Sequence, residues 1–119
     1  MELFKQNNHF KGVFSQPSDQ RNASATASNF ELLITDSDAN EKTFNGQITW
    51  TQINNSKTKV KGKYYEDNAY LVEYELIEGS GVSFPTIYEG KIISSSISGI
   101  AKHANYHGTF YLEIKDSIK

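Results

Sequence analysis

The sequence predicts an all-β fold, a single antiparallel up-and-down barrel of about eight strands, with a β-sandwich as the runner-up. Three observations support this prediction. Apolar and polar residues alternate with a period of two along most of the chain. The alternating stretches are short, and clusters of Gly, Asn, Asp and Ser that are typical of tight turns separate them. A motif consisting of an apolar residue, any residue and Gly recurs in six places.

Eight alternating segments are expected to form the strands. In chain order they are His9–Gln16, Ser28–Thr35, Lys42–Thr51, Lys57–Tyr65, Ala69–Ile77, Pro85–Ile93, Ser96–Ala101 and Gly108–Lys115. The connection between the first two, residues 17–27, is polar, rich in small residues and without a pattern. We interpret it as a flexible surface loop, because the one strand before it is too little to form a domain.

The chain is long enough for one domain, which we expect to span residues 1–119. Hydrophobic residues make up only 37% of the chain. Aromatic residues make up 13%, however, and each buries more area than an aliphatic residue does. A core built largely from rings is therefore feasible.

The recurring glycines need a reason, because glycine is normally disfavoured inside a strand. They are Gly12, Gly46, Gly62, Gly90, Gly99 and Gly108. We interpret them as inward-facing residues that relieve crowding where a strand bends to close a barrel. The alternative is that some of them mark strand ends or bulges.

Alternation also predicts which side chains point inward, because successive residues of a strand face opposite sides of the sheet. The inward sets are Phe30, Leu32 and Ile34; Phe44, Gly46, Ile48 and Trp50; Tyr70, Val72, Tyr74 and Leu76; and Phe110, Leu112 and Ile114. The same reasoning places Glu73 and Glu75 on the outer face.

Every second residue of the fourth segment is a lysine: Lys57, Lys59, Lys61 and Lys63. Four ammonium groups cannot be buried together, so this face is expected to meet water. A hairpin to the next strand would place Glu73 and Glu75 beside Lys59 and Lys61. We interpret the lysines as a solubilising face that fixes the register. The alternative is a patch for an acidic partner or for phosphate groups.

Several classes of function are disfavoured by composition. The net charge of −2 argues against nucleic-acid binding, which usually needs a basic excess. Without cysteine there is no disulfide and no thiolate site. The carboxylates are scattered, and His103 and His107 bracket an expected turn rather than a helical metal pair. We therefore expect no enzyme activity, no metal and no cofactor.

The N-terminal residues lack a basic start followed by an apolar run, so we see no signal peptide. No apolar stretch approaches the roughly 20 residues that a membrane-spanning helix needs. A cytoplasmic protein is the default expectation, and a secreted mature form stays open.

The segment Phe10-Lys-Gly-Val-Phe14 resembles the opening Gly-x-Trp strand of the calycins, which include lipocalins, fatty-acid-binding proteins and avidins, with Phe in place of Trp. The stretch from Asn29 to Ile34, followed by Phe44 to Ile48, is similar to the second and third strands of an avidin-like meander. The resemblance implies an up-and-down barrel that holds a small apolar molecule at its open end.

The resulting hypothesis is a non-enzymatic barrel that binds a small apolar or aromatic ligand at its mouth. The candidate ligand-binding residues are Phe14, Trp50, Tyr64, Tyr74 and Tyr88. The alternative is a protein-interaction or structural module with a filled core, whose partner is another protein or a second copy of the chain. It is motivated by apolar residues expected on the outer face: Leu33, Leu71, Ile87, Ile93, Ile100 and Tyr111.

Overall fold

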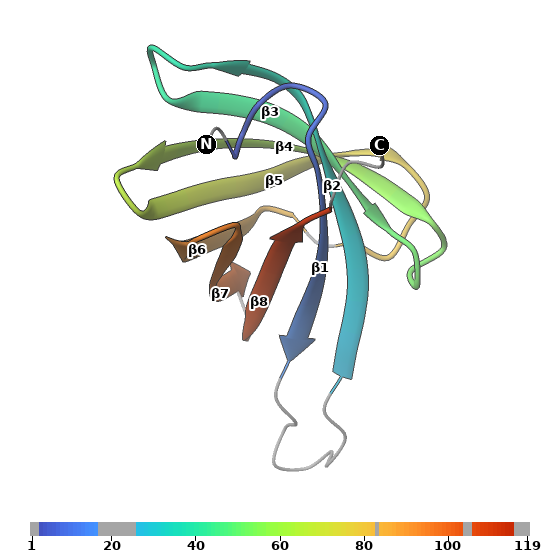
Figure 1. Ribbon diagram of the computed structural model, residues 1–119. Helices are drawn as coiled ribbons and strands as arrows, with labels where there is room; N and C mark the ends of the chain where they lie inside the picture. The colour runs from blue at the N-terminus through green and yellow to red at the C-terminus, as the bar shows by residue number, and fades with distance from the viewer. Residues whose placement is uncertain (1–2, 17–25, 83, 104–105, 116–119) are drawn as a thin grey trace.

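The computed structural model describes residues 3–16, 26–82, 84–103 and 106–115, which form a closed barrel of eight antiparallel strands (Figure 1). The strands are β1 (His9–Gln16), β2 (Thr26–Asp38), β3 (Thr43–Trp50), β4 (Ser56–Tyr65), β5 (Asn68–Glu78), β6 (Thr86–Ile93), β7 (Ser96–His103) and β8 (Tyr106–Ile114). Each strand pairs with its neighbours in chain order. The predicted all-β barrel is therefore confirmed.

The expected strand positions agree with the structure to within a few residues. The largest difference is β2, which begins at Thr26 and continues to Asp38. Its continuation passes a register shift between Ile34 and Asp36, where a bulge adds one residue. Thr26 and Ala27 thus belong to β2 rather than to the expected loop, whose residues 17–25 lie outside the described residues. In the part of the chain that is described, no helix is long and apolar enough to span a membrane.

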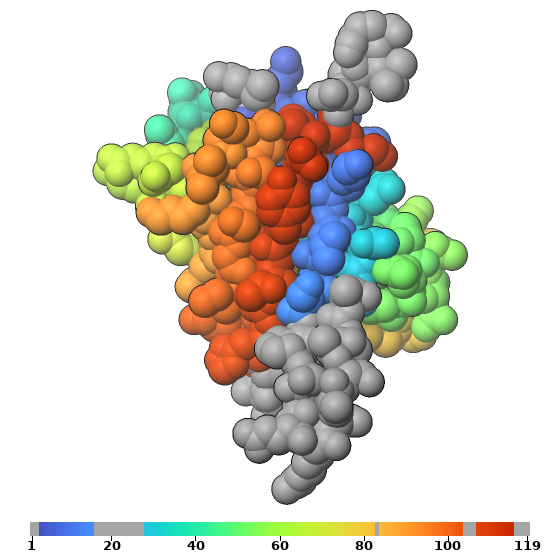
Figure 2. Space-filling model, turned by 60° about the horizontal axis from the view of Figure 1, so that its bottom comes forward, coloured from blue at the N-terminus to red at the C-terminus, as the bar shows by residue number. Residues whose placement is uncertain are grey.

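The barrel closes between its first and last strands. β8 lies antiparallel to β1, with Val13 opposite Tyr111 and Gly12 opposite Leu112. Figure 2 shows this seam, where β8 in red packs directly beside β1 in blue. Closure matters because an open sheet edge would leave unpaired backbone groups that invite aggregation.

All six glycines of the recurring motif lie on the inner face, as predicted, because each stands two residues from a buried inward side chain. A Cβ atom at Gly12 would lie 2.8 Å from the Phe30 ring. A Cβ atom at Gly62 would overlap the ring of Phe44, the residue paired with it across the sheet. Gly12, Gly62, Gly90 and Gly108 therefore make room for aromatic rings that cover them, which lets the strands curve around a filled interior.

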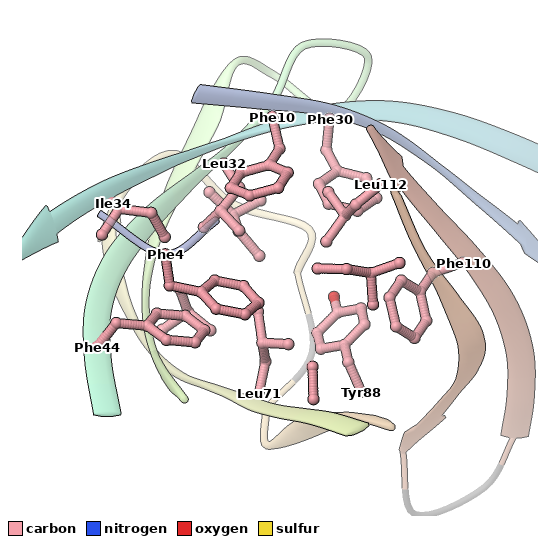
Figure 3. Packing of buried hydrophobic residues seen from close by; sticks show 14 of the residues in the cluster. Phe4, Phe10, Phe30, Leu32, Ile34, Phe44, Leu71, Tyr88, Phe110 and Leu112 are labelled. Carbon is pink, nitrogen blue, oxygen red and sulfur yellow. The ribbon is translucent and has the colours of Figure 1, made fainter. Parts of the chain in front are cut away.

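Residues 3–8, which we call the N-terminal plug, close one end of the barrel. Phe4 is only 2% exposed, and its ring stacks on Phe44 with centroids 4.4 Å apart (Figure 3). It also contacts Tyr64, at 4.9 Å. The plug is anchored where the Asn7 amide donates to the Ile34 carbonyl at 2.8 Å. The sequence did not predict this segment as part of the core.

The prediction for the face of β5 was wrong over most of the strand. Leu71 and Glu73 are buried, whereas Tyr70 and Tyr74 are exposed. The cause is the register with β4, in which Lys59 pairs with Glu75 but Val60 pairs with Glu73. Tyr74 is thus an extra residue in a bulge, and the side chains on either side of it alternate out of phase. Leu71 was expected among the apolar residues of the outer face, and it is instead buried.

The four lysines of β4 do lie on the outer face, which confirms that this face meets water. The Lys59 ammonium is 3.7 Å from the Glu75 carboxylate, as the hairpin predicted. Glu73 is not beside Lys61, because the bulge turns it inward. The Lys61 ammonium instead lies 5.0 Å from the centre of the Tyr74 ring.

Candidate functional site

The interior of the barrel holds a carboxylate. Glu73 is 1% exposed, and its Oε2 atom accepts hydrogen bonds from Trp50 Nε1 at 2.7 Å and from Thr58 Oγ1 at 2.5 Å. Its Oε1 atom accepts a hydrogen bond from the Tyr88 hydroxyl at 2.8 Å. We call these four residues the Glu73 cluster.

Four successive strands, β3 to β6, each contribute one member of the cluster. Trp50 and Thr58 point inward because they follow the regular alternation of β3 and β4. The bulge in β5 brings Glu73 to the same face. Tyr88 is opposite Leu71, two residues along β5 from Glu73, so its hydroxyl reaches the carboxylate. The cluster is therefore a direct result of strand register.

Burial raises the pKa of Glu73 above its ordinary value of 4.5, because the charged form loses its contact with water. The hydrogen bonds from Thr58, Trp50 and Tyr88 act in the opposite direction, since they stabilise the carboxylate. Desolvation is the larger effect. The charged form of Glu73 is therefore disfavoured inside the barrel, although each of its oxygens has a donor.

Aromatic rings surround the cluster. Phe30 packs 4.7 Å from Trp50, and Phe14 meets the Trp50 ring edge-on at 6.2 Å with an interplanar angle of 89°. Phe110 lies edge-on to Tyr88 at 5.3 Å. Figure 3 shows the Tyr88 hydroxyl pointing into the barrel, with Phe110 beside the ring. We call Phe14, Phe30, Trp50, Tyr88 and Phe110 the ring cluster, and of these only Phe14 is partly exposed.

The two clusters lie toward the barrel end away from the N-terminal plug, since Trp50 ends β3 and Phe44, which contacts the plug, stands near its start. We call this end the mouth. Asn54 and Asn55 form a tight turn there, with positive φ angles of 57° and 51°. Ser56 ties the turn to the β5–β6 connection, because its Oγ atom donates to the Ser80 carbonyl at 2.6 Å and accepts from the Ser80 amide at 2.8 Å.

Three of the five predicted ligand-binding residues come together at this end: Phe14, Trp50 and Tyr88. Tyr64 lies at the opposite end, against Phe4 of the plug. Tyr74 lies on the outer surface and is 39% exposed, so the expectation that it faces the interior was wrong. Sequence reasoning missed Glu73 and Thr58.

Two of the four lysines of β4, Lys61 and Lys63, border a surface groove of about 310 Å³ that lies on the outer face of β3, β4 and β5. Its lining includes Lys61, Lys63 and Tyr70. Whether this groove receives an acidic partner stays a prediction. His103 ends β7 and His107 lies in β8, opposite Lys102. Within the described ranges, no three His, Cys, Asp or Glu side chains gather as they would around a metal ion.

Chemically, the mouth end offers a hydrogen-bond acceptor that can carry charge, set among apolar rings. Such a combination can orient a small molecule, because the rings supply contact area and the polar atoms select for a donor. Comparison with known protein families and with curated proteins found no match to this chain.

Proposed function

We propose that this domain is a non-enzymatic barrel that binds a small apolar or aromatic ligand at its mouth, within the ring cluster and next to the Glu73 cluster. The single observation that carries the proposal is that Trp50 and Tyr88 both donate hydrogen bonds to one buried carboxylate, with Phe14 packed against the Trp50 ring. Ligand sites of this kind are mostly apolar, with a few polar groups aimed at the same point.

The cost of the Glu73 cluster supports this proposal. A carboxylate inside a small barrel is expensive to bury, and apolar side chains of similar size would fill the same space at less cost. Natural chains depart from such consistency most often where a function requires it. The resemblance of the closed eight-stranded barrel to the calycins supports the same proposal, because that resemblance implies a small molecule held at one open end.

The test uses Trp50, the one tryptophan of the chain, as its probe. A panel of small aromatic and aliphatic compounds is titrated while Trp50 fluorescence is recorded. We expect saturable changes for at least one compound, with weaker binding by Tyr88→Phe and unchanged binding by the matched control Tyr74→Phe. If every compound leaves the fluorescence unchanged and calorimetry detects no heat of binding, the proposal fails.

A second candidate function, a protein-interaction module with a filled core, is favoured by the outer face of β6, β7, β8 and β1. This face exposes Val13, Ile87, Ile100 and Tyr111. Val13 and Tyr111 are directly opposite each other, and Ile100 is paired with Thr109, two residues before Tyr111 in β8. Contiguous exposed apolar residues on a soluble domain often mark an interface.

Self-association through this face is tested by light scattering after size-exclusion chromatography. A dimer that dissociates in Tyr111→Lys but persists in Tyr65→Lys would support the module. A monomer at all concentrations would argue against it.

A further inference from the structure

The barrel interior holds an acidic side chain that has no buried basic side chain beside it among the described residues. In the part of the chain that the structure describes, the buried polar or charged residues are Ser56, Thr58, Glu73 and Thr86. None of these is basic, so the interior holds an acid without a cation. The ammonium groups of Lys59 and Lys102 lie outside, where they pair with Glu75 and Glu89 on the exposed surface.

The partners of Glu73 suit both of its protonation states. The Trp50 indole can only donate a hydrogen bond, whereas the hydroxyls of Thr58 and Tyr88 can donate or accept. A charged Glu73 therefore accepts all three bonds, and a neutral Glu73 can turn its proton toward the Tyr88 hydroxyl. The hydrogen bonds of the Glu73 cluster are therefore compatible with both the charged and the neutral form of Glu73.

The two oxygens of Glu73 differ in the number of donors that the described residues give them. In the charged state Oε2 accepts from both Trp50 and Thr58, while Tyr88 is the one donor to Oε1 among the residues that the structure describes. A carboxylate oxygen can accept two hydrogen bonds. A donor placed beside Oε1 would complete the set, and a cationic donor would also compensate the charge.

The ring cluster favours the same kind of ligand. Aromatic faces attract cations, most strongly where water is excluded. Trp50 and Tyr88, which donate to Glu73, are also in ring contact with Phe30 at 4.7 and 6.4 Å. Phe14 is the partly exposed ring of the ring cluster, and it lies against Trp50.

We infer that the ligand is a small aromatic or arylalkyl amine, whose protonated nitrogen pairs with Oε1 of Glu73 while its apolar body packs among Phe14, Trp50 and Phe110. This inference rests on the proposed function and deepens it by naming the class of ligand. The ammonium supplies the positive charge that the interior lacks. No proton or bond is exchanged in the step, which is binding alone.

The experiment compares two ligands that share a ring and a chain length. 2-Phenylethylamine and 2-phenylethanol are titrated separately at pH 7.5, with binding followed by Trp50 fluorescence and by calorimetry. We expect the amine to bind roughly tenfold or more tightly than the alcohol, because a hydrogen bond between two charged groups is stronger than one to a neutral hydroxyl.

Two variants locate the preference. Glu73→Gln keeps the size of the side chain and both kinds of hydrogen-bonding atom, so it should fold, which a thermal melt checks. We expect it to bind amine and alcohol with affinities within about twofold of each other, since the charge that separates them is gone. The matched control Glu75→Gln removes an outer carboxylate of the same strand and should keep the preference for the amine.

The outcomes distinguish a failure of the inferred amine preference from a failure of the proposed ligand binding. Equal affinity for the two ligands in the unmodified protein, or a preference for the amine that survives in Glu73→Gln, overturns the inference. If neither compound binds but a neutral member of the wider panel does, the inference is also overturned while the binding function stands. If nothing in the panel binds, the proposed function fails and the inference fails with it.

Discussion

Replacement of Phe4 by alanine tests whether the N-terminal plug belongs to the core. Phe4 is 2% exposed and stacks on Phe44 at 4.4 Å, nearly parallel at 4°. Burying a side chain of this size contributes about 1.5–3 kcal/mol, and an aromatic pair adds about 0.5–1.5 kcal/mol. Fraying of the shortened plug returns some chain entropy, which limits the loss. We expect the free energy of unfolding to fall by about 3 kcal/mol.

Urea denaturation followed by Trp50 fluorescence measures this loss, and Tm should fall by roughly 10 °C for a domain of this size. Tyr65→Ala is the control, because Tyr65 is 63% exposed and its removal should change stability by less than about 0.5 kcal/mol. If Phe4→Ala is as stable as this control, the plug does not occupy the barrel in solution and the reasoning is wrong.

Three further predictions concern the interior and the surface. The pKa of folded Glu73 is raised above 4.5, so the stability of the unmodified protein should decline as pH rises from about 4.5 through that pKa. The decline should be at most about 1.4 kcal/mol per pH unit. In thermal melts at several pH values, Glu73→Gln should remove it. Gly99→Ala should lose about 1–3 kcal/mol in urea denaturation, since the new Cβ atom meets the carbonyl oxygen of Glu89; no loss would contradict the inward packing of this glycine. Lys59→Ala should change stability by less than about 0.5 kcal/mol at any salt concentration, because its pair with Glu75 is exposed, and a larger loss would contradict this assignment.

Most of the fold could be predicted from the sequence because alternation and turn residues act locally. Asn54 and Asn55 are an example, since both adopt the positive φ angles that a tight hairpin requires. The inward glycines could also be predicted, because a residue that weakens a strand recurs only where curvature needs it. Alternation likewise placed Phe44 and Trp50 in the core.

The face of β5 could not be predicted in the same way. Tyr70, Val72 and Tyr74 form one apolar series and Ala69 with Leu71 forms another, so the pattern alone favours the wrong face. A bulge at Tyr74 decides which residues of β5 point into the barrel. This bulge depends on the pairing of β5 with β4 rather than on the residues of β5 alone. A glutamate is also expected on the outer face of a strand unless its hydrogen-bond donors are known, and the donors to Glu73 lie on other strands.

The N-terminal plug was missed for a related reason. Leu3 and Phe4 are two apolar residues in a short polar segment, with no periodicity that could predict a strand. Their burial follows from a tertiary contact, in which Phe4 fills the space between Phe44 and Tyr64. The same limit explains why Tyr64 was grouped with Trp50, although the two lie toward opposite ends of the barrel.

The most direct test of the account is a ¹³C NMR titration of the Glu73 side-chain carboxyl, read together with the indole N–H resonance of Trp50. We expect a midpoint above 4.5, a shift of the indole resonance with the same midpoint, and slow exchange of that N–H with water, because Trp50 Nε1 donates to Glu73 at 2.7 Å inside the barrel. A midpoint at or below 4.5, with an indole N–H that exchanges freely, would mean that the carboxylate is in solvent and that the site does not exist.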